Sequence, residues 1–174
     1  MDEDIRREML ALLPRLRRFA YGLTGSLDEG DDLVQATCER AIGHIDTWQP
    51  GTRLDSWMYR IARNTYFNTR RAKRVRESHL HAVESMTATS VDGARAMEAR
   101  LTFNAVRDFI ARLPEEQRAV ILLVCVEGLA YKEVAEILDL PIGTVTSRLA
   151  RARFALKDLV EGTDGGNCDA GEIS

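Results

Sequence analysis

Apolar residues recur every three or four positions along most of the chain, and no segment alternates as a β-strand would. Between residues 5 and 76 this spacing predicts three amphipathic helices that pack into one small helical domain. A loop over residues 44–52, which contains Trp48 and Pro50, separates the second helix from the third. The expected core positions are Met9, Leu12, Leu13, Leu16, Phe19, Leu23, Leu33, Thr37, Cys38, Ala41, Ile45, Leu54, Trp57, Met58, Ile61, Ala62 and Thr65.

A second helical domain is expected over residues 94–160. It opens with an apolar face over residues 101–110, and Leu113-Pro114-Glu115-Glu116 then predicts a helix start, because proline and acidic residues suit the first turn of a helix. The apolar helix that follows, Val120–Val126, should end at Gly128.

The clearest pattern is a pair of short amphipathic helices over residues 131–156. Asp139-Leu140-Pro141 ends the first helix, because a residue before proline is pushed out of the α region. The pattern predicts a helix-turn-helix, a motif typical of DNA-binding proteins. The apolar stripes of its two helices are Tyr131, Val134, Ala135 and Leu138, and Val145, Leu149, Ala152 and Leu156.

The outer face of the second helix would carry Thr144, Ser147, Arg148 and Arg151. Hydroxyls and guanidiniums at these positions can bond phosphates and base edges in a major groove. A solvated basic face is the plainer interpretation of the same pattern.

The rest of the chain carries no apolar stripe. Residues 77–93 are predicted to form a linker, and the glycine-rich, acidic residues 161–174 a disordered tail. The fold class expected is therefore all-α, with two small helical domains joined by a flexible linker.

Composition narrows the function classes. The chain has 174 residues, of which 45% are hydrophobic, so folded cores are expected. No apolar run is long enough for a membrane span, and the start Met1-Asp2-Glu3-Asp4 is acidic where a secretory signal would be basic, so a cytoplasmic location is expected.

Cysteine and histidine usage predicts neither disulfides nor a metal site. Cys38, Cys125 and Cys168 lack metal-ligand spacing, and the first two lie in apolar patterns typical of small core residues. No phosphate-binding glycine loop or nucleophile motif is visible, so we expect no cofactor and no enzymatic activity.

Charge is segregated, although the net charge is only −3. Residues 56–76 contain seven basic residues and no acid, while acidic residues dominate an earlier stretch from Asp28 to Glu39. On the third helix, basic side chains, an amide and an aromatic ring share the face opposite the core. Melted DNA would need such a face, because cations bind its backbone and flat surfaces or amides bind its unstacked bases. Trp48 either acts near this face or anchors its own loop. The residues of the face are Arg60, Arg63, Asn64, Phe67, Arg71 and Arg74.

Four ordered motifs resemble the successive signatures of the bacterial extracytoplasmic-function (ECF) sigma factors. They cover nearly the whole chain. The motifs are Asp31-Asp32-Leu33-Val34-Gln35-Ala36-Thr37, Trp57-Met58-Tyr59-Arg60-Ile61-Ala62-Arg63-Asn64, Leu113-Pro114-Glu115-Glu116-Gln117-Arg118 and Gly143-Thr144-Val145-Thr146-Ser147-Arg148. The resemblance implies a first domain (region 2) that opens the minus-10 promoter element and a second (region 4) that reads the minus-35 element, while catalysis stays with RNA polymerase.

The resemblance also assigns roles to residues. It implies that Asn64 helps to hold a flipped-out base beside a capturing loop at residues 44–55, while Arg60 and Arg63 contact the DNA backbone. Thr146 and Ala150 differ from the larger groove-facing residues of some relatives, so the promoter sequence cannot be transferred. The implied polymerase-docking residues are Asp31, Asp32, Gln35 and Arg40, and the implied groove-facing residues are Thr144, Thr146, Ser147, Arg148, Ala150 and Arg151.

The partners implied are core RNA polymerase, promoter DNA and an anti-sigma factor. The predicted linker over residues 77–93 could extend to about 60 Å at ~3.5 Å per residue. That reach would let one chain contact two promoter elements that lie about two helical turns of ~34 Å apart. Two alternatives stay open. A sigma-like decoy that sequesters an anti-sigma factor would be expected to lose the basic face, and an ordinary helix-turn-helix repressor would need no melting surface.

Overall fold

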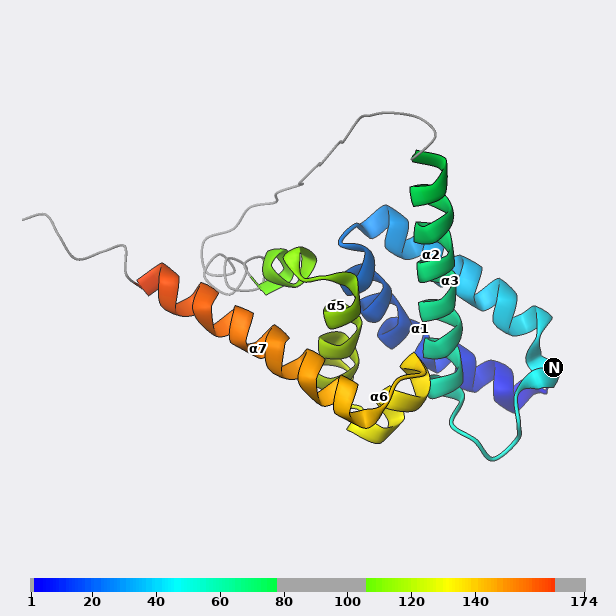
Figure 1. Ribbon diagram of the computed structural model, residues 1–174. Coiled ribbons are helices and arrows are strands. Elements are labelled where there is room, and N and C mark those ends of the chain that lie inside the picture. The colour runs from blue at the N-terminus through cyan, green and yellow to red at the C-terminus, as the bar shows by residue number, and fades with distance from the viewer. Residues whose placement is uncertain (1, 78–105, 165–174) are drawn as a thin grey trace, which may run out of the picture.

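The computed structural model describes residues 2–77 and 106–164, and all regular elements in these ranges are helical, which confirms the predicted fold class (Figure 1). Glu77, the first residue of the predicted linker, belongs to α3. Residues 78–93 of that linker, residues 94–105 of the predicted second domain and residues 165–174 of the predicted tail lie outside these ranges. The amino-terminal unit contains α1 (Glu3–Thr24), α2 (Leu27–Gly43), the short 3-10 helix η1 (Ile45–Thr47) and α3 (Leu54–Glu77). The carboxy-terminal unit contains helical residues 106–112, α5 (Glu115–Ile121), the π-helical segment η2 (Leu122–Val126), α6 (Tyr131–Leu138) and α7 (Ile142–Asp164).

Local signals explain where α1 ends and α2 begins. Gly25 ends α1 in the left-handed region at φ 76°, a conformation that glycine adopts without steric cost. Ser26 then caps α2, its side chain accepting a hydrogen bond from the backbone N–H of Glu29. The three helices bury a shared core in which the Phe19 and Tyr59 rings meet edge to face, with centroids 5.2 Å apart.

The helix-turn-helix forms as the sequence predicts, with one correction. Asp139 ends α6 in the left-handed region at φ 53°, and α7 begins directly after Pro141. Tyr131 was expected on the buried stripe, but it is exposed because it is the first residue of α6 and lies beyond the packed face. Ile137 completes that face instead.

The segment after α5 departs from regular α-helical geometry. Residues 122–126 form π-helical turns, which contain more residues per turn than an α-helix and so shift the positions that follow around the axis. Cys125 was expected in the core, and this shift explains why it is exposed; Cys38 is half-buried as a packing residue.

The two units pack against each other rather than standing apart. α1 contacts α5 and η2, α3 contacts α6, and one hydrophobic cluster runs through both units (Figure 1). The approach is close at Gly22, where an added Cβ would lie 2.5 Å from a methyl carbon of Leu122. The buried Arg118 guanidinium donates to the carbonyl oxygen of Leu23 at the end of α1, 2.7 Å away.

Two further features bear on the sequence predictions. α7 continues to Asp164, past residue 160 where the second domain was expected to end. Among the helices that the structure describes, none has the length and apolar character needed to cross a membrane.

Candidate nucleic-acid interface

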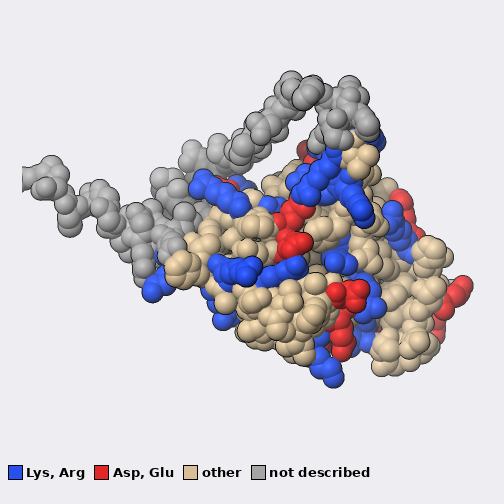
Figure 2. Space-filling model, in the orientation of Figure 1, with Lys and Arg blue, Asp and Glu red and all other residues tan. Residues whose placement is uncertain are grey.

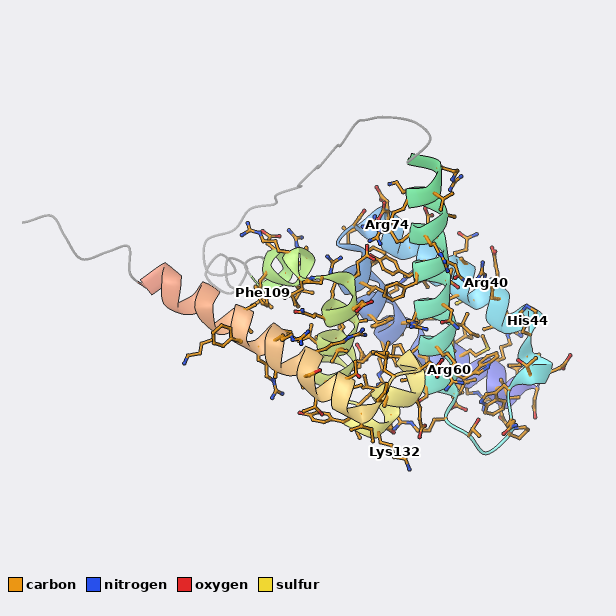
Figure 3. The ribbon with its side chains drawn as sticks, viewed as in Figure 1. Arg40, His44, Arg60, Arg74, Phe109 and Lys132 are labelled. Atoms are coloured by element: carbon orange, nitrogen blue, oxygen red, sulfur yellow. The ribbon has the colours of Figure 1, made fainter. Side chains whose placement is uncertain are left out.

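The basic face of α3 is turned toward the carboxy-terminal unit. Leu54, Met58 and Ala62 point into the core of the amino-terminal unit, so the opposite side of the helix carries its guanidiniums outward. Figure 3 shows Arg60 beside α6, near the start of α3, and Arg74 close to the other end of α3. The predicted DNA face therefore looks across the junction between the two units.

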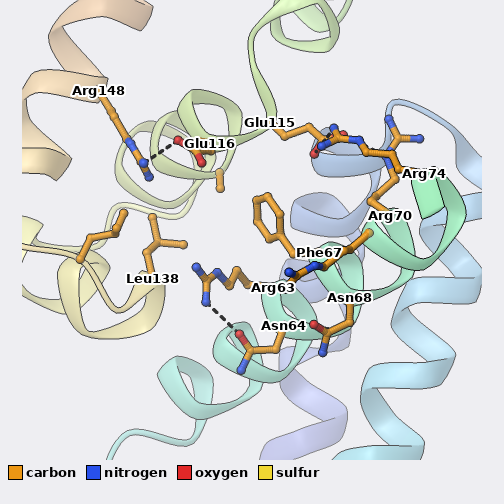
Figure 4. A pocket seen from close by; sticks show the side chains of 13 residues that line it. Arg63, Asn64, Phe67, Asn68, Arg70, Arg74, Glu115, Glu116, Leu138 and Arg148 are labelled. Carbon is orange, nitrogen blue, oxygen red and sulfur yellow. Dashed lines mark hydrogen bonds and ion pairs between the residues drawn. The ribbon is translucent and has the colours of Figure 1, made fainter. Parts of the chain in front are cut away.

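A cleft of about 480 Å³ lies at this junction. Figure 4 shows α3 side chains on one side of it and Leu138, Glu116 and Arg148 on the other. The sequence assigned the two sets of residues to separate domains and gave no sign that they share a cleft. The sequence-predicted site residues that line it are Arg63, Asn64, Phe67, Arg71, Arg74 and Arg148.

Three residues of α3 combine charge, an amide and an aromatic surface within the cleft. The Arg63 guanidinium lies 5.3 Å from the centroid of the Phe67 ring, and it donates to Oδ1 of Asn64 over 2.9 Å. A cation suits a phosphate, an aromatic face suits an unstacked base, and an amide can bond a base edge. The grouping predicted from helical spacing is present.

Several arginines of α3 already hold acceptors of the carboxy-terminal unit. The Arg60 guanidinium donates to the carbonyl oxygen of Glu136 over 2.8 Å. Nε of Arg70 lies 2.9 Å from Oε1 of Glu115, and Nη2 of Arg74 lies 3.1 Å from Oε2 of the same residue. Blue and red groups consequently lie next to each other where the units meet (Figure 2).

A second set of contacts surrounds Glu127, whose side chain is 0% exposed. Its carboxylate accepts from Arg15 Nε at 3.0 Å, from Arg18 Nε at 3.1 Å and from the Tyr59 hydroxyl at 2.8 Å. Burial, together with the hydrogen bond to this carboxylate, raises the pKa of the Tyr59 phenol above its ordinary value. Sequence reasoning missed this site, because an acid beside Gly128 is typical of an exposed turn.

Arg53 makes a further link between the units. It pairs with Asp55 on α3 and with Glu133 on α6. The Glu133 carboxylate also accepts the backbone N–H of Ala130 over 2.8 Å, so it caps α6 as well. The Glu133 side chain therefore both caps the start of α6 and links α6 to Arg53, the residue before α3.

The predicted reading face of α7 is only partly open. The hydroxyls of Thr146 and Ser147 donate to carbonyl oxygens of their own helix, at 3.0 and 3.1 Å, and Thr144 is half-buried. Arg148 is 20% exposed at its side chain and pairs with Glu116 of α5, a correction to its expected outward position that follows from the packing of α5 on α7. Arg151 is exposed.

The predicted polymerase-docking residues lie on α2. Asp31, Asp32 and Gln35 are exposed, and the carboxylate of Asp31 accepts from the Tyr21 hydroxyl over 2.8 Å. Arg40 donates to Oγ1 of Thr65 on α3 over 3.2 Å, and it lies away from the carboxy-terminal unit (Figure 3).

The predicted base-capturing loop borders a second cleft of about 530 Å³, between the start of α3 and α6. Trp48 lines this cleft and packs against the core, and its buried indole nitrogen has no hydrogen-bond partner among the described residues. Trp57, expected in the core, is half-buried at the same cleft. In the described ranges, no group of three or more acidic, histidine or cysteine side chains could hold a metal ion.

Comparison with known proteins connects these surfaces to one family. Residues 103–156 match the family described as Sigma-70, region 4, and residues 9–63 match the Sigma2 domain of PhyR. The ECF RNA polymerase sigma factor EcfG of Rhodopseudomonas palustris is 35% identical over 160 residues, which are 92% of this chain and 87% of that protein. The chain belongs to the ECF RNA polymerase sigma factors.

Two solved structures of known proteins are similar to this sigma factor. RpoE of Bartonella quintana, in complex with the anti-sigma factor NepR, has a TM-score of 0.77 at 31% identity, covering 92% of this chain and 98% of that one. The anti-anti-sigma factor PhyR of Bartonella quintana has a TM-score of 0.58 at 20% identity, covering 87% of this chain and 50% of that one, and shares the fold. The Sigma2 match lies within the amino-terminal unit, and the region 4 match covers most of the carboxy-terminal unit.

Proposed function

We propose that this sigma factor binds core RNA polymerase through α2, reads a minus-35 element with α7 and opens a minus-10 element with α3, in the bacterial cytoplasm. The observation that carries this proposal is the grouping of Arg63, Asn64 and Phe67 on one face of α3. A duplex-binding repressor has no need of an aromatic ring and an amide beside its cations, whereas a melted strand does.

The opening step requires compensation for base extrusion. Flipping one base costs about a few kcal/mol of unstacking, so the protein must give the extruded base and its strand new contacts. Asn64 would bond the edge of that base. Arg60, Arg63, Arg71 and Arg74 would bind the phosphates of the strand.

Recognition of the minus-35 element would rest on the exposed side of α7. Thr144, Thr146, Ser147, Arg148 and Arg151 are the candidates. The structure supports Arg151 most directly, because it is exposed. Arg148 would have to leave Glu116 before it contacts DNA.

Run-off transcription with purified core polymerase on a promoter library tests the proposal, together with capture of core polymerase by the tagged protein. The wild-type chain should retain core polymerase at moderate salt and direct transcripts from a subset of promoters. Asp32→Lys should weaken capture, while Glu8→Lys, the same charge change on α1, should not. Failure of the wild-type chain to retain core polymerase would refute the sigma function.

An anti-sigma factor is the further partner that we propose, because RpoE, with 31% identity, is bound to one in its solved structure. A decoy function is the second candidate, favoured by the match of residues 9–63 to the Sigma2 domain of PhyR. The basic face of α3 argues against the decoy, which would have no use for it. The run-off assay separates the two, since a decoy gives no transcripts with any promoter.

A further inference from the structure

Two side chains of α1 hold one carboxylate of α2. The hydroxyl of Tyr21 donates to Oδ1 of Asp31 over 2.8 Å, and Nε of Arg17 lies 3.5 Å from the same oxygen. Tyr21 and Arg17 are one helical turn apart on α1, so both reach α2 from the same face of their helix. Donating to a carboxylate raises the pKa of the Tyr21 phenol above its ordinary value, so the hydroxyl keeps its proton at neutral pH.

Gly30 lets the Tyr21 ring lie against the backbone of α2. A Cβ added at Gly30 would lie 2.1 Å from Cδ1 and 2.7 Å from Cε1 of that ring, well inside van der Waals contact. Glycine inside a helix is less stable than alanine, so its presence in the first half of α2 calls for a local reason. The packed ring supplies that reason, and its position fixes where the hydroxyl lies.

Asp31 and Asp32 are neighbours that differ in their support. Both are exposed acids of the motif that implies polymerase docking. The Asp31 side chain is 55% exposed, and both of its α1 donors use Oδ1, which leaves Oδ2 to accept from another molecule. In the described part of the chain, no side chain of α1 donates to the Asp32 carboxylate. One of the two acids is therefore held in place before any partner arrives.

We propose that Tyr21 is a positioning residue for polymerase docking, which holds the Asp31 carboxylate so that its second oxygen faces a cationic side chain of core polymerase. A side chain that is free to rotate loses rotamer freedom on binding, and that loss weakens the complex. The Tyr21 hydroxyl restricts Asp31 before binding. The inference rests on the proposed function, since it takes α2 to be the docking helix, and it adds a residue of α1 that no motif of the sequence indicated.

The first measurement is the affinity of the whole chain for purified core RNA polymerase. Tyr21→Phe keeps the ring against Gly30 and removes only the hydroxyl, so it should weaken binding about threefold or more. Asp31→Ala should weaken binding about tenfold or more, because it removes the polymerase contact itself. Wild-type affinity in either variant would overturn the proposal.

A double-mutant cycle shows whether Tyr21 acts through Asp31. Once Asp31→Ala is present, Tyr21→Phe should have no further effect on the affinity for polymerase. Combined with Asp32→Ala, the two losses should multiply, because Tyr21 does not hold that carboxylate. Losses that multiply in both combinations would show that Tyr21 acts independently of Asp31, and would overturn the positioning role.

Gly30→Ala tests the same geometry from α2. The new Cβ displaces the Tyr21 ring and should carry its hydroxyl away from Asp31, so binding should fall about as far as in Tyr21→Phe, although alanine favours the helix. Gly43→Ala is the control, because it makes the same substitution in α2 where a Cβ meets nothing within 4 Å, and it should match the wild type. Equal affinities for the Gly30 and Gly43 variants would overturn the proposal.

Urea unfolding of the same variants separates positioning from a purely structural role. A Tyr21→Phe variant that is less stable but binds polymerase with wild-type affinity would make the hydrogen bond structural only. If the wild type does not bind core polymerase, the sigma function fails and the inference falls with it. If the wild type binds and Asp32→Lys weakens binding while Tyr21→Phe does not, the sigma function stands and the positioning role is refuted.

Discussion

Asp55 is a buried carboxylate at the start of α3 that holds two arginines. It accepts from Arg53 Nη2 at 2.6 Å, from Arg15 Nη1 at 3.3 Å and from the backbone N–H of Ser56 at 2.7 Å. Burial by itself raises the pKa of this carboxyl, but the hydrogen bonds and the charges of the two guanidiniums outweigh it, so the pKa of Asp55 lies below its ordinary value. The charged form is therefore the one that stabilises the fold.

Asp55→Asn should cost on the order of 1–3 kcal/mol of unfolding free energy at pH 7, because it takes one of their carboxylate partners from the guanidiniums of Arg15 and Arg53. A lowered pKa in the folded state means that this stabilisation is present above the unfolded pKa of about 3.9 and is lost as the pH falls through the lower folded value. Urea unfolding at pH 7 and pH 3 measures it. The difference in unfolding free energy between wild type and variant should be smaller at pH 3 than at pH 7. An equal difference at both pH values would contradict a stabilising role for the charged Asp55 carboxylate.

A second prediction at this scale concerns Asn64, which is exposed and accepts a hydrogen bond from Arg63. Asn64→Ala should leave binding to a minus-35 duplex intact but reduce promoter opening about tenfold or more, because the amide acts only on an extruded base. Permanganate reactivity of the melted strand measures opening. Asn68→Ala removes the same amide one turn along α3 and is the control; equal opening by Asn64→Ala and wild type would remove Asn64 from the mechanism.

At the scale of single elements, the sequence predicted the features that depend on neighbouring residues alone, such as the buried face of a helix and the point where a helix ends. The stripes of α1, α3 and α7 and the stop at Asp139 are confirmed, because burial at helical spacing and backbone geometry before proline are local properties. The π-helical turns of η2 were not predictable, since an apolar run such as Leu122–Val126 fits a buried α-helix as well. The candidate residues of α3 were found as a set, but not their ion-pair partners.

The recognition helix carries a prediction that separates two arginines. We expect Arg151→Ala to behave as the loss of a base contact, costing roughly 1–3 kcal/mol and relaxing preference at one position. Arg148→Ala should behave as the loss of a phosphate contact, with similar weakening for all sequences and a salt slope smaller by about one. Its pairing with Glu116 should make the loss smaller than for a free guanidinium.

Binding of both variants to a randomised minus-35 duplex at two salt concentrations measures these differences. Arg6→Ala, which removes a charge near the start of α1, is the control for net charge and should match the wild type. Unchanged affinity in both α7 variants would mean that this helix does not face DNA.

Over the whole molecule, packing reconciles a net charge of −3 with a nucleic-acid-binding function. Basic residues of the amino-terminal unit meet acids that lie far along the chain: Glu115 is 45 positions from Arg70, and Glu127 is 112 positions from Arg15. No pattern of helical spacing relates positions so far apart, which is why the sequence predicted two independent domains. The structure instead places one domain's acids against the other's arginines, so much of the charge is neutralised internally.

This internal neutralisation should appear in the salt dependence of DNA binding. Binding of a single strand releases counterions, so affinity falls with salt by a slope of about 0.7 for each phosphate neutralised. In the wild type, Arg70 and Arg74 must first give up Glu115, and salt weakens those pairs as well, which eases opening and offsets part of the loss. Glu115→Gln should therefore show a steeper decline in affinity between 50 and 200 mM salt than the wild type, while Glu116→Gln keeps the wild-type slope. Fluorescence anisotropy with a fluorescein-labelled single-stranded DNA 20-mer of mixed sequence measures the slopes. Parallel lines for all three proteins would show that the arginines of α3 bind DNA without first releasing an internal partner.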